Sequence, residues 1–337
     1  CRQPDQDRAI GLTGAVPTRQ TQTFVDRALC ARDLAHRQPR FGDQQDAAVK
    51  QNDGADDAED IGNPQHAMER PREGQDEADG DERGDDADQD GQLDLFVTNF
   101  EREYNNLYLQ TGAGQFTDAI ATSGIKEAGY LMLGFGTQFL DADLDGWPDL
   151  FVANGHIDDF SRNGIPYQMP PQFFRNRQNG RFRELSAKQL GPYFQMRHLG
   201  RSVARLDWNR DGLEDLVIGH LGESTALLTN RTPRASGYLS LELRGVDSSR
   251  DAIGTRIEVQ SGDRHAHYQL SAGDGYQASN DRHLIFGLAD ADQVEELRIT
   301  WPTGKSQSFS HLPTNTEWLA IEGRDHLIQL ARNRRRP

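Results

Sequence analysis

The chain has 337 residues, a formal net charge of −16, 33 glycines and 14 prolines, and 35% of its residues are hydrophobic. This length leaves room for two domains, and the composition favours a loop-rich β protein over a helical one. No apolar run approaches the roughly 18 residues of a membrane-spanning helix, so we expect no transmembrane segment.

The negative charge is concentrated in one stretch of the chain. Residues 51–90 hold 16 acidic side chains against three arginines, a net charge of −13, which leaves −3 for everything else. The folded part is therefore close to neutral, and we expect no nucleic-acid partner. The basic segment 326–337 is interpreted as a solvated tail rather than a binding patch.

Residues 1–84 contain two aromatic residues, Phe24 and Phe41, and no sustained period of 2 or 3.6. We interpret them as a disordered segment or as a non-native, out-of-frame segment joined to a real one, because the composition changes abruptly near Asp85. Cys1 and Cys30 are the two cysteines of the chain and imply no disulfide framework. No signal peptide is recognised at the start of the chain.

Three Asp-rich loops follow, each of nine residues and each leading into an apolar run. Positions 1, 3, 5 and 9 are occupied by Asp86, Asp88, Asp90 and Asp94 in loop one, by Asp141, Asp143, Asp145 and Asp149 in loop two, and by Asp207, Asn209, Asp211 and Asp215 in loop three. Clustered carboxylates repel one another unless a cation lies among them. Ca²⁺ is the best candidate, because it takes 6 to 8 oxygen ligands in irregular geometry.

These loops differ from an EF-hand, which needs a bidentate glutamate at position 12 and a helix on each side. Position 12 is Val97, Val152 or Ile218, each inside a β-branched and aromatic run, so we expect the loops to join strands. The alternative is a set of Asp/Gly turns that hold no metal. Loop three has Asn209 in place of an acid, and we expect it to bind Ca²⁺ more weakly than loop two.

The segments after the loops repeat a common order of short apolar runs. The runs are residues 95–99, 106–110 and 114–118 after loop one, 150–154, 172–176 and 180–184 after loop two, and 216–220 and 226–230 after loop three. Spacings of 55 and 66 residues between the loops leave room for about four short strands each. This is the size of one β-propeller blade.

The Asp-rich loops and the run Gly134-Phe135-Gly136-Thr137 resemble the FG-GAP (VCBS) repeats of integrin-α-like β-propellers. The resemblance implies partial propeller blades over residues 85–235. Such propellers have seven blades, and this chain shows two complete repeats and part of a third, which puts the geometry of the first repeat in question.

From residue 236 the pattern changes to that of a separate small β module. Residues 238–245 alternate apolar and polar, and in the last predicted strand Leu297, Ile299 and Trp301 point to one face. The runs 273–279, 283–288 and 294–304 are similar to the ASPIC/UnbV domain, which follows FG-GAP repeats in the cartilage acidic protein family and in many bacterial secreted proteins. The resemblance implies such a domain over residues 236–325.

The predicted fold class is therefore all-β, with partial integrin-α-like propeller blades followed by a small β domain. The resemblance implies a non-catalytic Ca²⁺-binding scaffold for adhesion or recognition of a protein or glycan ligand, located in the periplasm, at the cell surface or outside the cell. The alternative is an enzyme or accessory protein of natural-product biosynthesis, as for UnbV-like members. His156 lies near Asp158 and Asp159 but has no paired nucleophile, so we expect no catalytic residues.

Overall fold

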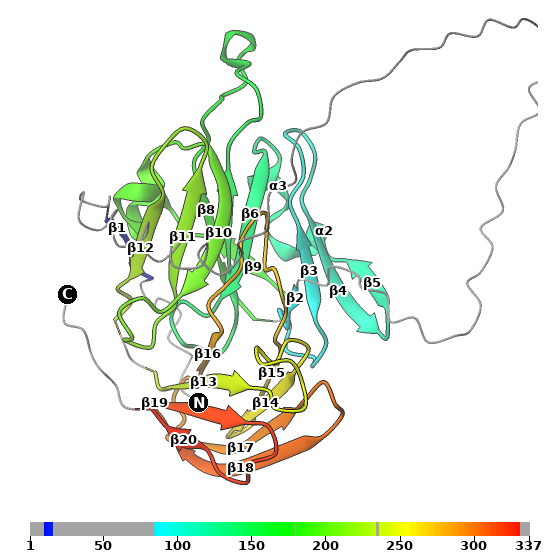
Figure 1. Ribbon diagram of the computed structural model, residues 1–337. Helices are drawn as coiled ribbons and strands as arrows, with labels where there is room; N and C mark the ends of the chain where they lie inside the picture. Colours follow the sequence, from blue (N-terminus) through cyan, green and yellow to red (C-terminus); the bar gives the residue numbers. More distant parts are fainter. Residues whose placement is uncertain (1–9, 16–83, 179, 234–235, 331–337) are drawn as a thin grey trace, which may run out of the picture. The chain divides into compact units, whose positions relative to one another are not determined.

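The structure is a computed structural model that describes residues 10–15, 84–178, 180–233 and 236–330 (Figure 1). Its described strands form five four-stranded sheets, and its described helices are single short turns. Three sheets are propeller-type blades, and two make up the C-terminal domain. The expected all-β fold, with propeller blades followed by a small β domain, is confirmed.

The first two blades are antiparallel meanders whose strands follow one another in the chain. Blade one consists of β2 (Gly84–Asp85), β3 (Asp94–Val97), β4 (Asn106–Gly112) and β5 (Gln115–Asp118). Blade two consists of β6 (Gly134–Leu140), β7 (Asp149–Asn154), β8 (Gln172–Asn176) and β9 (Phe182–Glu184). Short helices α2 (Ile120–Ser123) and α3 (Lys126–Gly129) connect the two blades, and the helical turn η1 (Ser161–Asn163) lies between β7 and β8.

Blade three takes its fourth strand from the beginning of the chain. Its own strands are β10 (Gly200–Leu206), β11 (Asp215–His220) and β12 (Ala226–Asn230), preceded by α4 (Ala187–Leu190) and η2 (Pro192–Gln195). Strand β1 (Leu12–Ala15) pairs antiparallel with β12, with Leu12 opposite Asn230. The sequence predicted no element here, so residues 12–15 differ from the disordered or non-native segment expected over 1–84; residues 16–83 lie outside the described residues.

Successive blades pack face to face, and blade two is buried on both faces. In β7, Leu150 and Val152 pack toward blade one, whereas Phe151 and Ala153 pack toward blade three. This alternation follows from the period of two residues along a strand. It explains why residues 149–154 are all buried and why residues 150–153 form a continuous apolar run rather than an alternating one.

The C-terminal domain is built from two sheets that share one core. One sheet has the order β16 (His283–Gly287), β13 (Tyr238–Arg244), β19 (Thr316–Ile321) and β20 (Ile328–Gln329). The other has the order β15 (Arg264–Gln269), β14 (Arg256–Ser261), β17 (Gln293–Thr300) and β18 (Ser306–Pro313). Strands β13 and β19 are parallel, and the other pairs are antiparallel.

Leu297, Ile299 and Trp301 lie in the core between these two sheets, as their alternation predicts. Strand β20 falls within the predicted basic tail and pairs with β19; residues 331–337 lie outside the described residues. In the part of the chain that is described, no helix is long and apolar enough to cross a membrane.

Candidate metal centres

The three Asp-rich loops share one backbone conformation. Position 4 has a positive φ in each of them, 60° at Gln89, 58° at Leu144 and 54° at Arg210. Position 6 is a glycine with φ of 85° to 89°, in the left-handed region that glycine enters without strain. The sequence predicted the glycine turn. It gave no sign of the second positive φ, because Gln, Leu and Arg have no chemistry in common.

The aspartate at position 1 holds this turn together. Asp86, Asp141 and Asp207 each accept a hydrogen bond from the backbone N–H of the position-6 glycine, at 3.0, 2.8 and 2.7 Å. In loops two and three the second carboxylate oxygen also accepts the N–H of position 5. The carboxylate at position 1 therefore sets the loop conformation.

The aspartate at position 9 ties each loop to the third strand of its blade. One oxygen of each accepts a backbone N–H across the sheet, from Gln110 to Asp94 at 3.0 Å, from Asn176 to Asp149 at 2.8 Å and from Asn230 to Asp215 at 2.7 Å. These three aspartates are at most 1% exposed. The same bond in three blades gives a residue-by-residue correspondence between the repeats.

Two of the loops gather their carboxylates closely enough to hold one ion. Oxygens of Asp86, Asp88 and Asp94 lie within 4.8 Å of one another, and so do oxygens of Asp141, Asp143 and Asp145. Within the described residues, the buried atoms Asp86 Oδ1 and Asp149 Oδ2 have no hydrogen-bond partner. Buried polar atoms are rarely left in this state, so an oxygen-seeking cation fits these loops.

The remaining predicted ligands are arranged differently. Asp90 accepts hydrogen bonds from the main chain and side chain of Gln92. In loop three, Asn209 bonds Asp211 through both its amide oxygen and its amide nitrogen. Within the described chain, loop three forms no group of three carboxylates of the kind seen in loops one and two.

Burial raises the pKa of most of these carboxyl groups. It raises the pKa of Asp86 and of Asp94 to about 7, and that of Asp215 to about 8. In loop two, burial and then the neighbouring carboxylates raise the pKa of Asp141 and Asp149 well above the ordinary range. An ion of charge +2 at these positions would reverse this preference for the protonated form.

Loop two contains a cation of its own, which the sequence analysis missed. The Arg175 guanidinium, contributed by β8, places Nη2 2.5 Å from Asp143 Oδ2 and 3.6 Å from Asp145 Oδ2. Its side chain is 10% exposed, and that of Asp143 is fully buried. Arg175 immediately precedes Asn176, so its counterparts in blades one and three are Leu109 and Thr229. Comparing the repeats at this position is the sequence signal that would have identified it.

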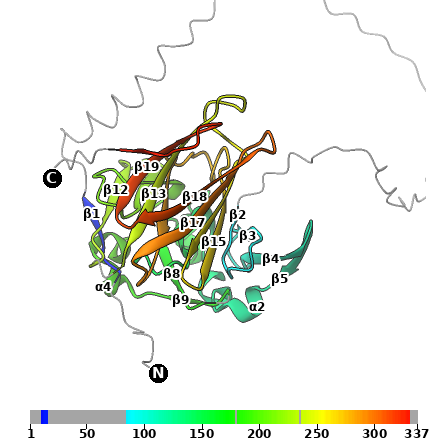
Figure 2. The same cartoon turned by 90° about the horizontal axis from the view of Figure 1, so that it is seen from below.

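The C-terminal domain packs on all three loops. The position-6 glycines lie against one side chain each of that domain, with His267 beside Gly91, Arg264 beside Gly146 and the Tyr238 ring against Gly212. The Leu144 carbonyl accepts the N–H of Ala289 at 3.0 Å. A side chain on Gly287 would overlap Asp141 and lie 2.7 Å from the Leu144 backbone. The loops therefore form the surface on which this domain sits (Figures 1 and 2).

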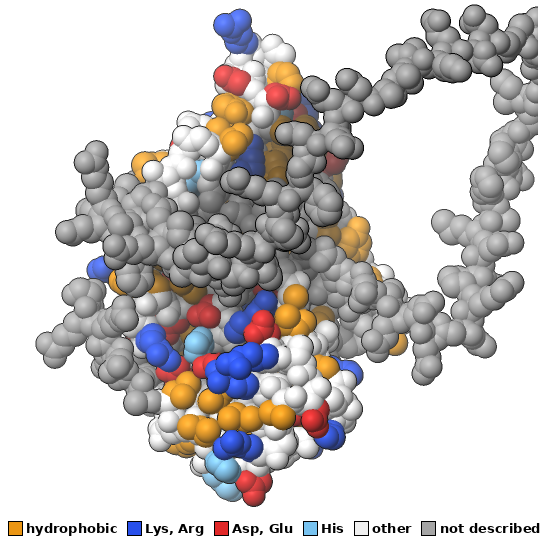
Figure 3. All heavy atoms as spheres, in the orientation of Figure 1, with side chains coloured by type: hydrophobic (Ala, Val, Ile, Leu, Met, Phe, Trp, Pro, Cys, Tyr) orange, Lys and Arg blue, Asp and Glu red, His pale blue; other side chains and the backbone are white. Residues whose placement is uncertain are grey.

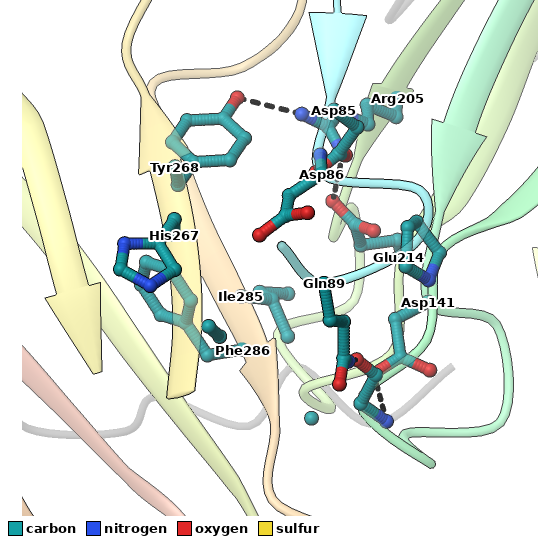
Figure 4. Close-up of a pocket in the computed structure, with 14 residues that line it drawn as sticks. Asp85, Asp86, Gln89, Asp141, Arg205, Glu214, His267, Tyr268, Ile285 and Phe286 are labelled. Atoms are coloured by element: carbon teal, nitrogen blue, oxygen red, sulfur yellow. Dashed lines mark hydrogen bonds and ion pairs between the residues drawn. The ribbon is translucent and has the colours of Figure 1, made fainter. Parts of the chain in front are cut away.

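A small pocket at this junction is lined by residues of all three loops and of β2, β10, β15 and β16 (Figure 4). In it, the largely buried Arg205 guanidinium donates to the Tyr268 hydroxyl at 2.6 Å and the Phe139 carbonyl at 2.9 Å. It also lies 3.4 Å from Glu214 and 3.8 Å from Asp85. The sequence analysis missed this network, since its members are brought together from five strands and loops that are distant in the sequence.

His156 has a packing role. His156 is fully buried between the rings of Phe100 and Phe160, and its Nε2 lies 3.3 Å from Glu101. Its Nδ1 accepts the N–H of Asp158 at 3.1 Å, which leaves the ring hydrogen on Nε2. The His156 ring thus contacts two aromatic rings and has a polar partner at each nitrogen.

Comparison with known proteins agrees with this architecture. A model described as FG-GAP-like repeat matches residues 86–152 and 141–218, and a model described as ASPIC and UnbV matches residues 245–326. The chain is 24% identical over 265 residues to human cartilage acidic protein 1, an alignment that covers 64% of this chain and 39% of that protein. The expected FG-GAP-like repeats and ASPIC/UnbV domain are confirmed, and these are repeat-type families of non-enzymatic scaffolds. The chain spans well under half of that relative's length.

Proposed function

We propose that this chain, with its FG-GAP-like repeats and ASPIC/UnbV domain, is a Ca²⁺-binding, non-catalytic scaffold for adhesion or ligand recognition. The observation that carries the proposal is the repeated carboxylate loop, with three carboxylates within 4.8 Å in loop one and again in loop two. Buried carboxylates at such spacing are costly unless protonated or paired with a cation. A divalent ion bound in each loop offsets the cost of burying the carboxylates of that loop.

The donor set favours Ca²⁺ over other divalent ions. Each loop offers side-chain oxygens at positions 1, 3, 5 and 9, all of them carboxylates except the amide of Asn209 in loop three. Each also offers the main-chain carbonyl of position 7, which belongs to Gln92, Trp147 or Leu213. These are hard oxygen ligands with no thiolate, and an irregular loop of this kind suits Ca²⁺ better than the strict octahedron of Mg²⁺. When bound, the ion supplies positive charge and fixes the loop; it needs no part in a reaction.

The opposite ends of the same strands supply the proposed recognition surface. Loops one, two and three precede β3, β7 and β11, and these strands lead into exposed apolar side chains at their other ends. These are Phe100, Ile157, Phe160 and Leu221, which are 41%, 50%, 41% and 47% exposed. The β7–β8 connection projects at the top of Figure 1, and Figure 3 shows hydrophobic side chains along it. Aromatic and aliphatic anchors on projecting loops suit a protein or glycan ligand.

Location in the periplasm, at the cell surface or outside the cell accompanies this function. Irregular oxygen-ligand sites in extracellular modules bind Ca²⁺ with dissociation constants of about 0.1 to 1 mM. Such sites are filled only where Ca²⁺ is abundant. The FG-GAP-like repeats support an extracellular-type setting.

An enzyme or accessory role in natural-product biosynthesis is the second candidate. The observation in its favour is Glu214, whose pKa is raised by burial to about 6 and which lines the junction pocket. A carboxyl group with this pKa can exchange a proton near neutral pH. Glu214 is paired with Arg205, however, and both are used in the domain junction.

The test is thermal unfolding of the full chain with EDTA or with millimolar Ca²⁺. One site at a hundredfold excess of ligand, for example about 10 mM Ca²⁺ against a dissociation constant of about 0.1 mM, stabilises the folded state by about 2.7 kcal/mol. That corresponds to a rise in midpoint of roughly 5–10 °C for a chain of this size. Asp145→Ala in loop two should reduce the rise, and Asp325→Ala, at a fully exposed side chain outside the loops, should not. A folded wild-type chain whose midpoint is indifferent to Ca²⁺ would refute the metal-binding half of the proposal.

A further inference from the structure

Arg175 occupies the place among the loop-two carboxylates where an ion would bind. Its Nη2 is 2.5 Å from Asp143 Oδ2, and the Asp143 side chain is fully buried. Ca²⁺ requires oxygen ligands at 2.3–2.6 Å. The same oxygen cannot hold the guanidinium at hydrogen-bond distance and a Ca²⁺ ion at ligand distance in this arrangement, since the two cations would repel each other at close range.

The other two repeats have no cation at this position. The hydrogen bonds from Gln110 and Asn230 to the position-9 aspartates place Leu109 and Thr229 where blade two has Arg175. Leu109 is partly buried in the core between blades one and two, and Thr229 accepts a hydrogen bond from the Trp208 indole at 3.0 Å. Neither can supply charge. Arg175 is therefore specific to loop two among these three blades.

With Arg175 included, the charges around each loop no longer predict the order of Ca²⁺ affinities that the sequence suggested. Loop one carries four aspartates, whereas loop two carries four aspartates and the guanidinium of Arg175, and loop three carries three aspartates and Asn209. Loops two and three thus have the same net charge. The expectation that loop two binds more tightly than loop three counted the aspartates alone.

The loop-two carboxylates nevertheless keep an unmet demand for positive charge. Asp149 Oδ2 is buried and has no hydrogen-bond partner among the described residues, and the Asp149 side chain is 1% exposed. Arg175 therefore neutralises part of the cluster. The loop remains suited to a divalent ion, provided that the guanidinium can withdraw.

We propose, resting on the Ca²⁺-binding function above, that Arg175 is a tethered internal cation that competes with the metal ion for loop two. In the metal-free protein it pairs with Asp143 and Asp145 and stabilises the loop. Ca²⁺ binding displaces the guanidinium from Asp143. Arg175 thereby lowers the affinity of loop two and couples ion binding to a side-chain movement in β8, which does not occur in the other two blades.

The test uses Tb³⁺ as the probe, because the indole of Trp147 at position 7 of loop two can sensitise its luminescence. The loop-two signal is the part that is lost in Trp147→Phe, and Ca²⁺ is then titrated to displace Tb³⁺. Arg175→Thr and Arg175→Leu install the residues of blades three and one, and Arg175→Lys keeps the charge. We expect Arg175→Thr and Arg175→Leu to bind about tenfold more tightly or better at low salt, and Arg175→Lys to stay near wild type.

Thermal unfolding in EDTA separates competition from a purely structural role. Without metal, Arg175→Thr should unfold at a lower temperature than wild type, because its carboxylates lose their counter-charge. With saturating Ca²⁺ the two should unfold at similar temperatures. If Arg175 had a purely structural role, Arg175→Thr would lower both the unfolding midpoint in Ca²⁺ and the affinity of loop two for the ion. That result overturns the proposal.

The remaining outcomes are also decisive. Unchanged or weaker loop-two affinity in both Arg175→Thr and Arg175→Leu overturns the proposal, as does the absence of a Trp147-sensitised signal in every variant. Calorimetric titration of the wild-type chain with Ca²⁺ then distinguishes failure of the Arg175 proposal from failure of the proposed Ca²⁺-binding function. Binding at other loops leaves the Ca²⁺-dependent scaffold standing, whereas no binding at all removes both.

Discussion

The replacement Arg205→Met should destabilise the chain strongly, because Arg205 is the largely buried cation that neutralises carboxylates at the domain junction. Its guanidinium lies between Glu214 at 3.4 Å and Asp85 at 3.8 Å, and it donates to the Tyr268 hydroxyl and the Phe139 carbonyl. Its side chain is 13% exposed. Methionine keeps the apolar stem and removes the charge and the hydrogen-bond donors.

The expected loss is about 3–5 kcal/mol at pH 8, the cost of leaving buried charges without their partner. The loss should be smaller at pH 5. Burial already raises the pKa of Glu214 from its ordinary value of 4.5 to about 6, and Arg205 opposes that rise, so removing Arg205 raises the pKa further. A raised carboxyl pKa favours the folded state below the unfolded pKa, and this contribution is lost as pH rises through the folded pKa.

Urea unfolding at pH 5 and pH 8 measures both quantities. Arg298→Met is the matched control, because Arg298 is half exposed and pairs with Glu296 at 3.4 Å on the surface; its loss should be at most about 1 kcal/mol. The double variant Arg205→Met/Glu214→Gln should recover part of the loss. A loss for Arg205→Met of less than about 1 kcal/mol at pH 8, or one that is equal at both pH values, would refute the assignment of Arg205 as the junction cation.

Three further predictions concern the loops and the core. Gly212→Ala should lower the thermal midpoint more than Gly222→Ala. Both glycines have positive φ, but the new methyl group meets the Tyr238 ring at Gly212 and open space at Gly222. Equal midpoints for the two variants would contradict the contact between Gly212 and Tyr238. Trp301→Ala should cost about 3–5 kcal/mol in urea unfolding, because its side chain is 1% exposed in the C-terminal core; a loss below 1 kcal/mol would argue against that core. In EDTA, the midpoint should fall from pH 5 to pH 8, since the pKa values of Asp86 and Asp94 are raised to about 7 and that of Asp215 to about 8; Ca²⁺ should flatten this fall, and an EDTA midpoint that rises with pH would contradict the sign.

The loops and the blade repeat could be predicted from the sequence because their information is local. Each loop repeats its own ligands within nine residues, and the strand after it follows at once. The hydrogen bond from the third strand to the position-9 aspartate could not be predicted from residue types. Its donors are the main-chain N–H groups of Gln110, Asn176 and Asn230, which do not depend on the side chain.

Strand β1 shows where local pattern fails. Its residues Leu12–Ala15 lie in a segment of low aromatic content, and the partner strand β12 is more than 200 residues away in the chain. Leu12 is fully buried in the core shared with blade three. No short-range periodicity reports a pairing of this kind, because a single edge strand of four residues is specified by the sheet it joins.

The junction explains why the charged residues that sequence reasoning missed occur together. The Asp-rich loops present carboxylates to the C-terminal domain. A domain that packs against such loops must either bury those charges away from water or neutralise them with its own cations. Arg205, in β10, forms ion pairs with Asp85 and Glu214, and Arg264, in β15, donates a hydrogen bond to the Asp145 carbonyl. Protein cations are thus placed around the loops, while three or more oxygens in loops one and two still converge within each loop. The division is physically consistent, because guanidinium groups can neutralise carboxylates and bridge domains, whereas a small ion of higher charge can fit among the oxygens that converge within one loop.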